Sequence, residues 1–161
     1  MNFAILLGLF LASAIAAPPV GPTSDAEETV LWEEGSSHFV EGRFKEASLA
    51  LSRLWERYPA STHRLEAGLK LSQAWIETGD CALATPVLRA LVSAKSTTET
   101  GFISRVWLGQ CQIKLKQFQR ALLTAVETES RRPAPAPEIR ARLLVVKARA
   151  LLGLNESLRA E

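Results

Sequence analysis

The stretch FVEGRFKEASLALSRLWERYP, residues 39–59, decides the fold. A glycine separates two apolar segments in it, and a proline closes the second one. Glycine readily takes the left-handed backbone conformation that ends a helix, and the residue before a proline disfavours helix. The stretch therefore predicts a first helix that ends near Gly42, a second helix that starts just after it, and an exit from this pair at Pro59.

The glycine recurs at a fixed spacing. Gly79 lies 37 residues after Gly42, and further steps of the same length reach Lys116 and Gly153. Other columns agree in size or polarity: Ala47 with Ala84 and Ala121, Gly35 with Ser72 and Gly109, Pro59 with Pro133. Agreement in several columns indicates internal repeats, each an antiparallel pair of helices. We place them at about residues 25–60, 61–97 and 98–134, with a partial repeat at 135–161.

Local patterns refine the helix ends. Ser24 and Ser96 are each followed three residues later by a glutamate, which is the form of a capping box at the start of a first helix. Pro86 falls inside a second helix, where its missing N–H is expected to kink the helix or to shorten its start. Small residues such as Gly35 and Ser72 are expected to let neighbouring helices approach closely.

The first twenty residues, MNFAILLGLFLASAIAAPPV, have the composition of a secretion signal. An apolar segment from Phe3 to Ala12 precedes Ala14-Ile15-Ala16, the small-x-small pattern that a signal peptidase needs. The segment is shorter than the roughly 20 residues that cross a bilayer. We expect a signal peptide at 1–16, a short linker at 17–24 and a repeat domain at 25–161, with no integral membrane segment after cleavage.

Composition and motifs argue against several classes of function. The chain has 19 basic and 17 acidic residues, so its net charge of +2 predicts no general attraction to nucleic acid. It contains no G-x-S-x-G, H-E-x-x-H, C-x-x-C or glycine-rich phosphate loop. The acidic residues of DAEETVLWEEG, residues 25–35, suit the positive end of a helix dipole. We expect no catalytic site, no metal and no cofactor, and therefore not an enzyme.

The repeats resemble the tetratricopeptide repeat in three features: Leu108-Gly109 in a first helix, an alanine such as Ala47 with an apolar residue four positions later, and the closing proline. The stretch YPASTHRLEAGLKLSQAWIETGD, residues 58–80, is similar to the longer repeats of bacterial envelope proteins. Such proteins include the C-terminal domain of the Tol-Pal-associated YbgF proteins and the BamD-type outer-membrane assembly lipoproteins. The resemblance implies an all-α, right-handed solenoid of about three and a half helix pairs. It also implies a periplasmic adaptor, with the first helices forming a concave wall.

Apolar residues seven positions apart recur in each first helix and define a candidate partner groove. Seven residues are nearly two helical turns, so each pair lies on one face of its helix. Polar residues in nearby columns could bind a peptide backbone. The alternative is that the apolar ladder is ordinary core between the helices. The candidate groove residues are Trp32, Phe39, Leu69, Gln73, Ile76, Val106, Gln110, Ile113, Leu143 and Lys147.

Cys81 and Cys111 are the only cysteines. In an oxidising compartment they could form a disulfide that joins two adjacent repeats, because the helices that carry them are expected to stack. The alternative is a pair of buried thiols that act as small hydrophobic residues.

The last predicted first helix, residues 137–153, is apolar on nearly every side, and only residues 154–161 remain for its partner helix. A terminal repeat normally needs a polar outer face. We expect this end to be covered by self-association or by another protein, and opposite charges at the two ends favour end-to-end docking. A shortened gene product is the alternative.

These features predict a noncatalytic protein–protein interaction scaffold, periplasmic or secreted, that takes a protein or peptide partner of the cell envelope and acts in envelope assembly or maintenance. Two alternatives remain open. The first is a structural oligomerisation subunit whose apolar ladder is internal. The second, by analogy with the family alone, is an accessory regulator of a peptidoglycan or envelope enzyme.

Overall fold

A computed structural model describes residues 22–95 and 97–159 of the chain. This part contains seven helices and no strand, which confirms the all-α prediction for the described residues. The signal peptide predicted at 1–16 lies outside them. The helices are α1 (Pro22–Val40), α2 (Phe44–Arg57), α3 (Arg64–Thr78), α4 (Cys81–Ala94), α5 (Glu99–Lys114), α6 (Phe118–Glu129) and α7 (Pro137–Arg159).

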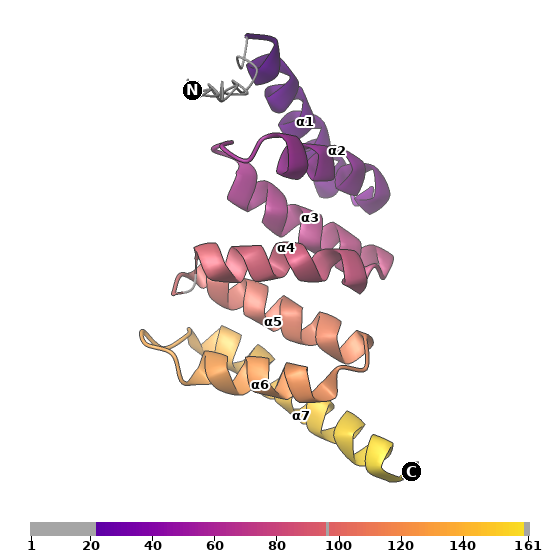
Figure 1. Cartoon of the computed structure of the whole chain (residues 1–161), viewed down its shortest axis with the longest axis vertical. Coiled ribbons are helices and arrows are strands. Elements are labelled where there is room, and N and C mark those ends of the chain that lie inside the picture. The colour runs from indigo at the N-terminus through magenta and orange to yellow at the C-terminus, as the bar shows by residue number, and fades with distance from the viewer. Residues whose placement is uncertain (1–21, 96, 160–161) are drawn as a thin grey trace, which may run out of the picture.

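The helices stack in chain order along the longest axis of the molecule (Figure 1). Each helix packs against the next one in the chain, and α1, α3, α5 and α7 also touch one another in succession. The core forms three clusters. One joins α1 to α4, one joins α4 to α5, and one joins α5, α6 and α7. The second helices α2 and α6 end before Pro59 and Pro133, as predicted.

Three turns use the left-handed backbone conformation. Gly42 and Gly79 have φ angles of 73° and 91°, so the sequence prediction is confirmed at both. Lys116, at the same place in the third turn, has a φ of 57° without the freedom of glycine. Each of these residues follows the end of a first helix and directs the chain back along it.

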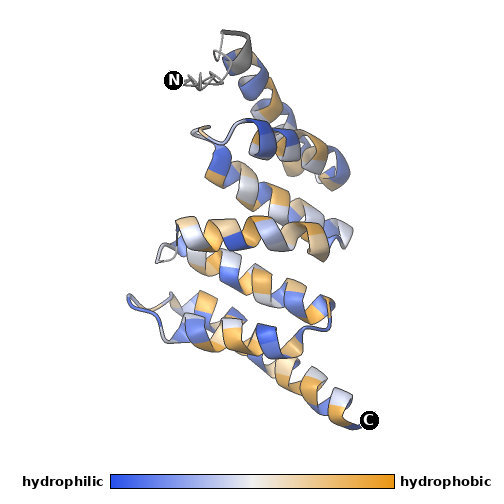
Figure 2. Cartoon of the chain, in the orientation of Figure 1, coloured by the Kyte–Doolittle hydropathy of each residue, from blue (hydrophilic) through white to orange (hydrophobic). Residues whose placement is uncertain are grey.

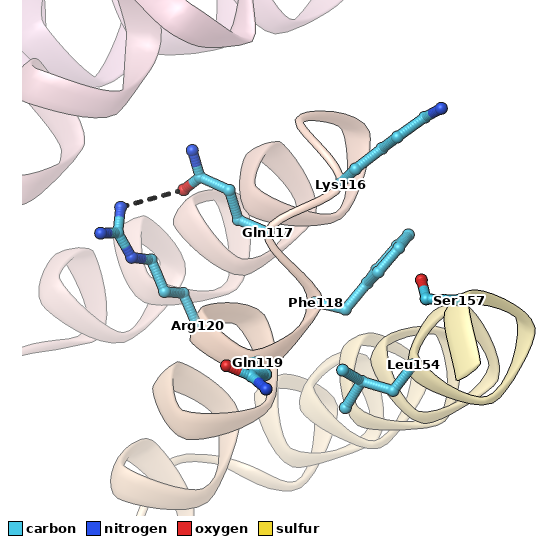
Figure 3. Close-up of a pocket in the computed structure, with 7 residues that line it drawn as sticks. All are labelled: Lys116, Gln117, Phe118, Gln119, Arg120, Leu154 and Ser157. Carbon is cyan, nitrogen blue, oxygen red and sulfur yellow. Dashed lines mark hydrogen bonds between the residues drawn. The ribbon is translucent and has the colours of Figure 1, made fainter. Parts of the chain in front are cut away.

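The prediction that a turn follows Gly153 is wrong. Helix α7 continues through this residue to Arg159, so residues 154–159 extend α7 instead of starting another helix. A Cβ atom at Gly153 would lie 2.4 Å from the Phe118 ring, whereas nothing lies within 4 Å of the equivalent point at Gly79. The side chain of Phe118 lies beside Ser157 of α7 (Figure 3). Gly153 thus provides room for an aromatic ring.

Two predicted helix starts change, and the start of α4 does not. Helix α1 begins at Pro22, so residues 22–24 belong to the helix and not to the predicted linker. The cap of α5 is Thr98, whose hydroxyl accepts a 3.3 Å hydrogen bond from the N–H of Gly101, and not Ser96. Helix α4 starts five residues before Pro86, so the proline does not shorten it. The carbonyl that loses its partner belongs to Ala82, an exposed residue that water can reach.

Neighbouring helices approach closely at small residues, as the repeat columns predict. A Cβ atom at Gly35 would lie 2.6 Å from the side chain of Leu51, and one at Gly109 would lie 2.7 Å from Val146. Ser72 is buried in the same column and donates a 2.8 Å hydrogen bond to the carbonyl of Gly68. None of the helices in the described ranges is long and apolar enough to cross a membrane.

Replacing Gly109 with alanine tests this close packing. Glycine-to-alanine changes in an exposed helix stabilise by about 1 kcal/mol. Here the new methyl group meets Val146, so we expect the free energy of unfolding to fall by about 1–3 kcal/mol, as measured by urea denaturation. In the double variant Gly109→Ala/Val146→Ala the added methyl group has room, so the loss should be smaller than the sum of the two single losses. An increase in stability for Gly109→Ala alone would contradict the packing described here.

Candidate protein-binding groove

The structure divides the predicted ladder into two classes. Val106 and Leu143 are 1% and 0% exposed and belong to the core between α5, α6 and α7. The groove prediction is therefore wrong for these two residues, because α7 packs on both α5 and α6 and thereby buries Val106 of α5 and its own Leu143. Trp32, Phe39 and Leu69 are half-buried along α1 and α3.

A lysine covers the aromatic end of the ladder. The Lys70 Nζ atom lies 4.6 Å from the centre of the Trp32 ring and 6.0 Å from that of Phe39. It also donates a 3.4 Å hydrogen bond to the hydroxyl of Ser36 and pairs with Glu66 at 3.3 Å. A cation over aromatic faces is attracted by their negative π surfaces. This end of the ladder already has an internal partner.

The other end of the ladder opens into a pocket of about 250 Å³ between α3, α5 and α7. Ile76 and Ile113 supply its apolar surface, and both are half-buried. Gln110 completes the predicted residues that the structure brings together here. Gln73 lies outside this pocket, and Lys147 instead pairs with Glu129 at 2.8 Å.

Three charged residues at the rim were missed by the sequence analysis. Glu77, Lys114 and Arg149 line the pocket with the predicted residues. The Lys114 Nζ atom donates a 3.3 Å hydrogen bond to the carbonyl of Ile76, near the end of α3, where helix carbonyls carry partial negative charge. Glu77 and Lys114 stand one repeat apart, directly after the two isoleucines, so the repeat itself contained the information needed to find them.

The size and lining of the pocket suit one side chain of a partner. Pockets for small molecules usually measure about 300–1,000 Å³, and this one is smaller and open. Two cationic side chains and one carboxylate surround an apolar floor, which fits an apolar anchor residue next to an acidic one. Within the described ranges, no three His, Cys, Asp or Glu side chains gather as metal ligands would.

The two cysteines meet where α4 packs on α5. Both are buried free thiols, and both belong to the core cluster between these two helices. Burial raises the pKa of the Cys111 thiol, and its contact with Cys81 raises the pKa further. The expected proximity is present, while the disulfide itself stays a prediction.

No protein-family model matches the chain, and no curated protein sequence matches it.

Both thiols should react slowly in the folded, reduced protein. The thiolate is the reactive form. The raised pKa of Cys111 makes its thiolate scarcer at neutral pH, and burial limits access of the reagent to both cysteines. We expect iodoacetamide to label Cys81 and Cys111 only after unfolding, as followed by intact mass. Rapid labelling in the folded state would contradict the buried geometry. In protein isolated under oxidising conditions, a mass lower by two hydrogen atoms that reduction restores would establish the disulfide.

Proposed function

We propose that the chain is a noncatalytic protein-interaction scaffold of the tetratricopeptide type, a right-handed solenoid of about three and a half helix pairs. Left-handed turns at Gly42, Gly79 and Lys116, one repeat apart, support this architecture. Contacts that join only near neighbours along the chain support it as well. The observation that carries the function is the open amphipathic pocket at Ile76 and Ile113, where the repeat pattern predicts a groove.

The proposed place of action is the periplasm or the cell exterior, with a role in cell-envelope assembly or maintenance. The support comes from the sequence. Residues 1–16 have the pattern of a signal peptide, and residues 58–80 are similar to the repeats of bacterial envelope proteins.

The proposed partner is a protein segment that inserts one apolar side chain between Ile76 and Ile113. An acidic residue next to that anchor would pair with Lys114 or Arg149, both of which are exposed at the rim. Such rim pairs contribute more to specificity and to the rate of encounter than to affinity.

A structural oligomerisation subunit is the second candidate. The burial of Val106 and Leu143 favours it, because part of the ladder is internal, and so does the large apolar surface that α7 exposes. The two candidates differ in whether a partner occupies the pocket at Ile76.

Aspartate substitutions separate groove from core. Ile76 and Ile113 line an open pocket, so in Ile76→Asp/Ile113→Asp each carboxylate can reach water. We expect a loss of about 1 kcal/mol in stability and loss of partner capture. The control Val106→Asp places a charge in a buried site and should destabilise by several kcal/mol. Thermal unfolding and photo-crosslinking in intact cells, with the crosslinker at Gln110, measure the two effects. Unfolding of the double isoleucine variant would assign the whole ladder to the core.

Charge reversal tests the acidic residue of the partner. Lys114→Glu and Arg149→Glu change exposed side chains, so the melting temperature should hardly move. Crosslinking from Gln110 should fall several-fold in each variant, because each exposed pair contributes about 0.2–1 kcal/mol. The control is Arg89→Glu, an exposed reversal on α4. Equal crosslinking in all three variants would refute an acidic partner at this rim.

A further inference from the structure

Helix α7 exposes an apolar surface opposite to its buried face. The buried face consists of Ile139, Leu143, Val146, Ala150 and Gly153, which pack on α5 and α6. The opposite face, here called the α7 stripe, carries Leu144 (57% exposed), Val145 (50%), Leu151 (51%), Leu152 (61%) and Leu158 (74%), with exposed Ala148 in the middle. Figure 2 shows hydrophobic residues along α7 out to the end that extends past α6. So large an apolar surface marks an interaction site.

The same columns are buried in the earlier repeats. Leu71 and Leu108 occupy the column of Val145, and Ala74 and Cys111 occupy the column of Ala148. All four lie in the core clusters formed with neighbouring helices. In the described part of the chain, the α7 stripe has no such neighbour.

We propose that a second copy of the chain covers the α7 stripe, with the two α7 helices packed antiparallel about a two-fold axis at Ala148. The order of apolar residues along the stripe is similar in both directions from Ala148. Leu144 and Leu152 lie four residues before and after it, and Val145 and Leu151 lie three before and after. An antiparallel pair therefore places leucine on leucine and valine on leucine, as a two-fold interface requires. At the axis alanine meets alanine, which allows close approach of the helices.

A knob and a hollow lie at matching places. A hollow of about 440 Å³ beside the stripe is lined by Glu129, Pro137, Arg140, Ala141 and Leu144. Leu158 is the most exposed residue of the stripe and lies ten residues after Ala148. In the antiparallel pair, Leu158 of one copy is level with the residue ten positions before Ala148 in the other copy, where this hollow lies. Each copy thus places its Leu158 at the hollow of the other, on the same edge of the stripe.

Charges on the other edge of the stripe are also self-complementary. At 100° per residue, Glu138, Arg142 and Glu156 lie along one edge, and a two-fold axis brings this edge against the same edge of the second copy. Arg142 then lies within about 3 Å, along the axis, of the level of Glu156 from the other copy. Within one chain, residues 142 and 156 are about 21 Å apart. Arg149 lies opposite Arg149 of the second copy, and the repulsion between the two cations weakens the dimer. Because salt screens such charges, the dissociation constant of the dimer should depend on ionic strength.

End-to-end docking of the stripe on α1 explains less. The exposed face of α1 carries Glu33 and Glu34 beside Val30. These carboxylates would lose water against leucines of the stripe, which is unfavourable for an unpaired charge.

The proposed interface is small. A single pair of α7 helices buries less than the roughly 800 Å² per partner of a standard interface. We therefore expect a reversible dimer with a dissociation constant in the micromolar range.

Sedimentation of the purified protein between about 1 and 100 µM, a range that brackets weak dimers, tests the proposal. Wild type should shift from monomer to dimer with concentration. Ala148→Glu places two carboxylates together at the axis and should remain monomeric, with unchanged helical circular dichroism because the residue is exposed. Ala90→Glu, an exposed alanine on α4, is the matched control and should dimerise as wild type does. A wild type that stays monomeric would overturn the proposal. Self-association that Ala148→Glu leaves intact would overturn it as well, because the interface would then lie outside the α7 stripe.

A charge exchange tests the antiparallel register. Arg142→Glu and Glu156→Arg should each weaken the dimer several-fold at low salt. The double variant Arg142→Glu/Glu156→Arg restores opposite charges across the axis and should recover most of the affinity. Because the two positions are far apart within one chain, recovery cannot come from the monomer. Failure of the double variant to recover would exclude this register. Crosslinking at Gln110 reports on the pocket separately, so the two proposals can fail independently.

Discussion

The close approach of helices at glycines sets the arrangement of the whole stack. At four interior positions the neighbouring side chain already occupies the space that a Cβ atom would fill, at distances of 2.4–2.7 Å. Helices at such a separation share one layer of apolar residues, and their dispersion contacts depend steeply on distance. This spacing brings the helices into the contacts that form the core clusters. The four contacts are Gly35 with Leu51, Gly68 with Trp55, Gly109 with Val146 and Gly153 with Phe118.

The sequence predicted the helix pairs because local chemistry decides them. Gly42 and Gly79 need only a positive φ, which depends on the residue and its immediate neighbours. Gly153 occupies the same column, but glycine is needed there because the Phe118 ring of another helix lies against it. No local sequence pattern distinguishes a glycine that turns the chain from one that makes room for a ring. The cap of α5 is Thr98, although the sequence pattern pointed to Ser96. Ser96, Thr97 and Thr98 all carry hydroxyl groups that can cap a helix, so the local pattern does not distinguish them.

The candidate groove was predictable where the repeat is regular. Ile76 and Ile113 come together because they occupy the same column of stacked first helices, and Gln110 lies one turn before Ile113 on α5. Val106 was assigned wrongly because the column rule treats all repeats alike, while α7 covers α5 more completely than α5 covers α3. Lys70 could not be placed from the pattern. Its long side chain reaches from α3 to rings on α1, and the sequence does not specify where a flexible chain ends.

Contacts that join only near neighbours have a mechanical consequence. In the described ranges, helices more than two apart in the chain do not touch, and each core cluster contacts only the next one along the stack. Every joint along the stack would bear the same force applied at its ends, and the molecule could lengthen by opening the weakest joint while the others stay closed. An elastic element of this kind can remain attached to two bodies that move relative to each other.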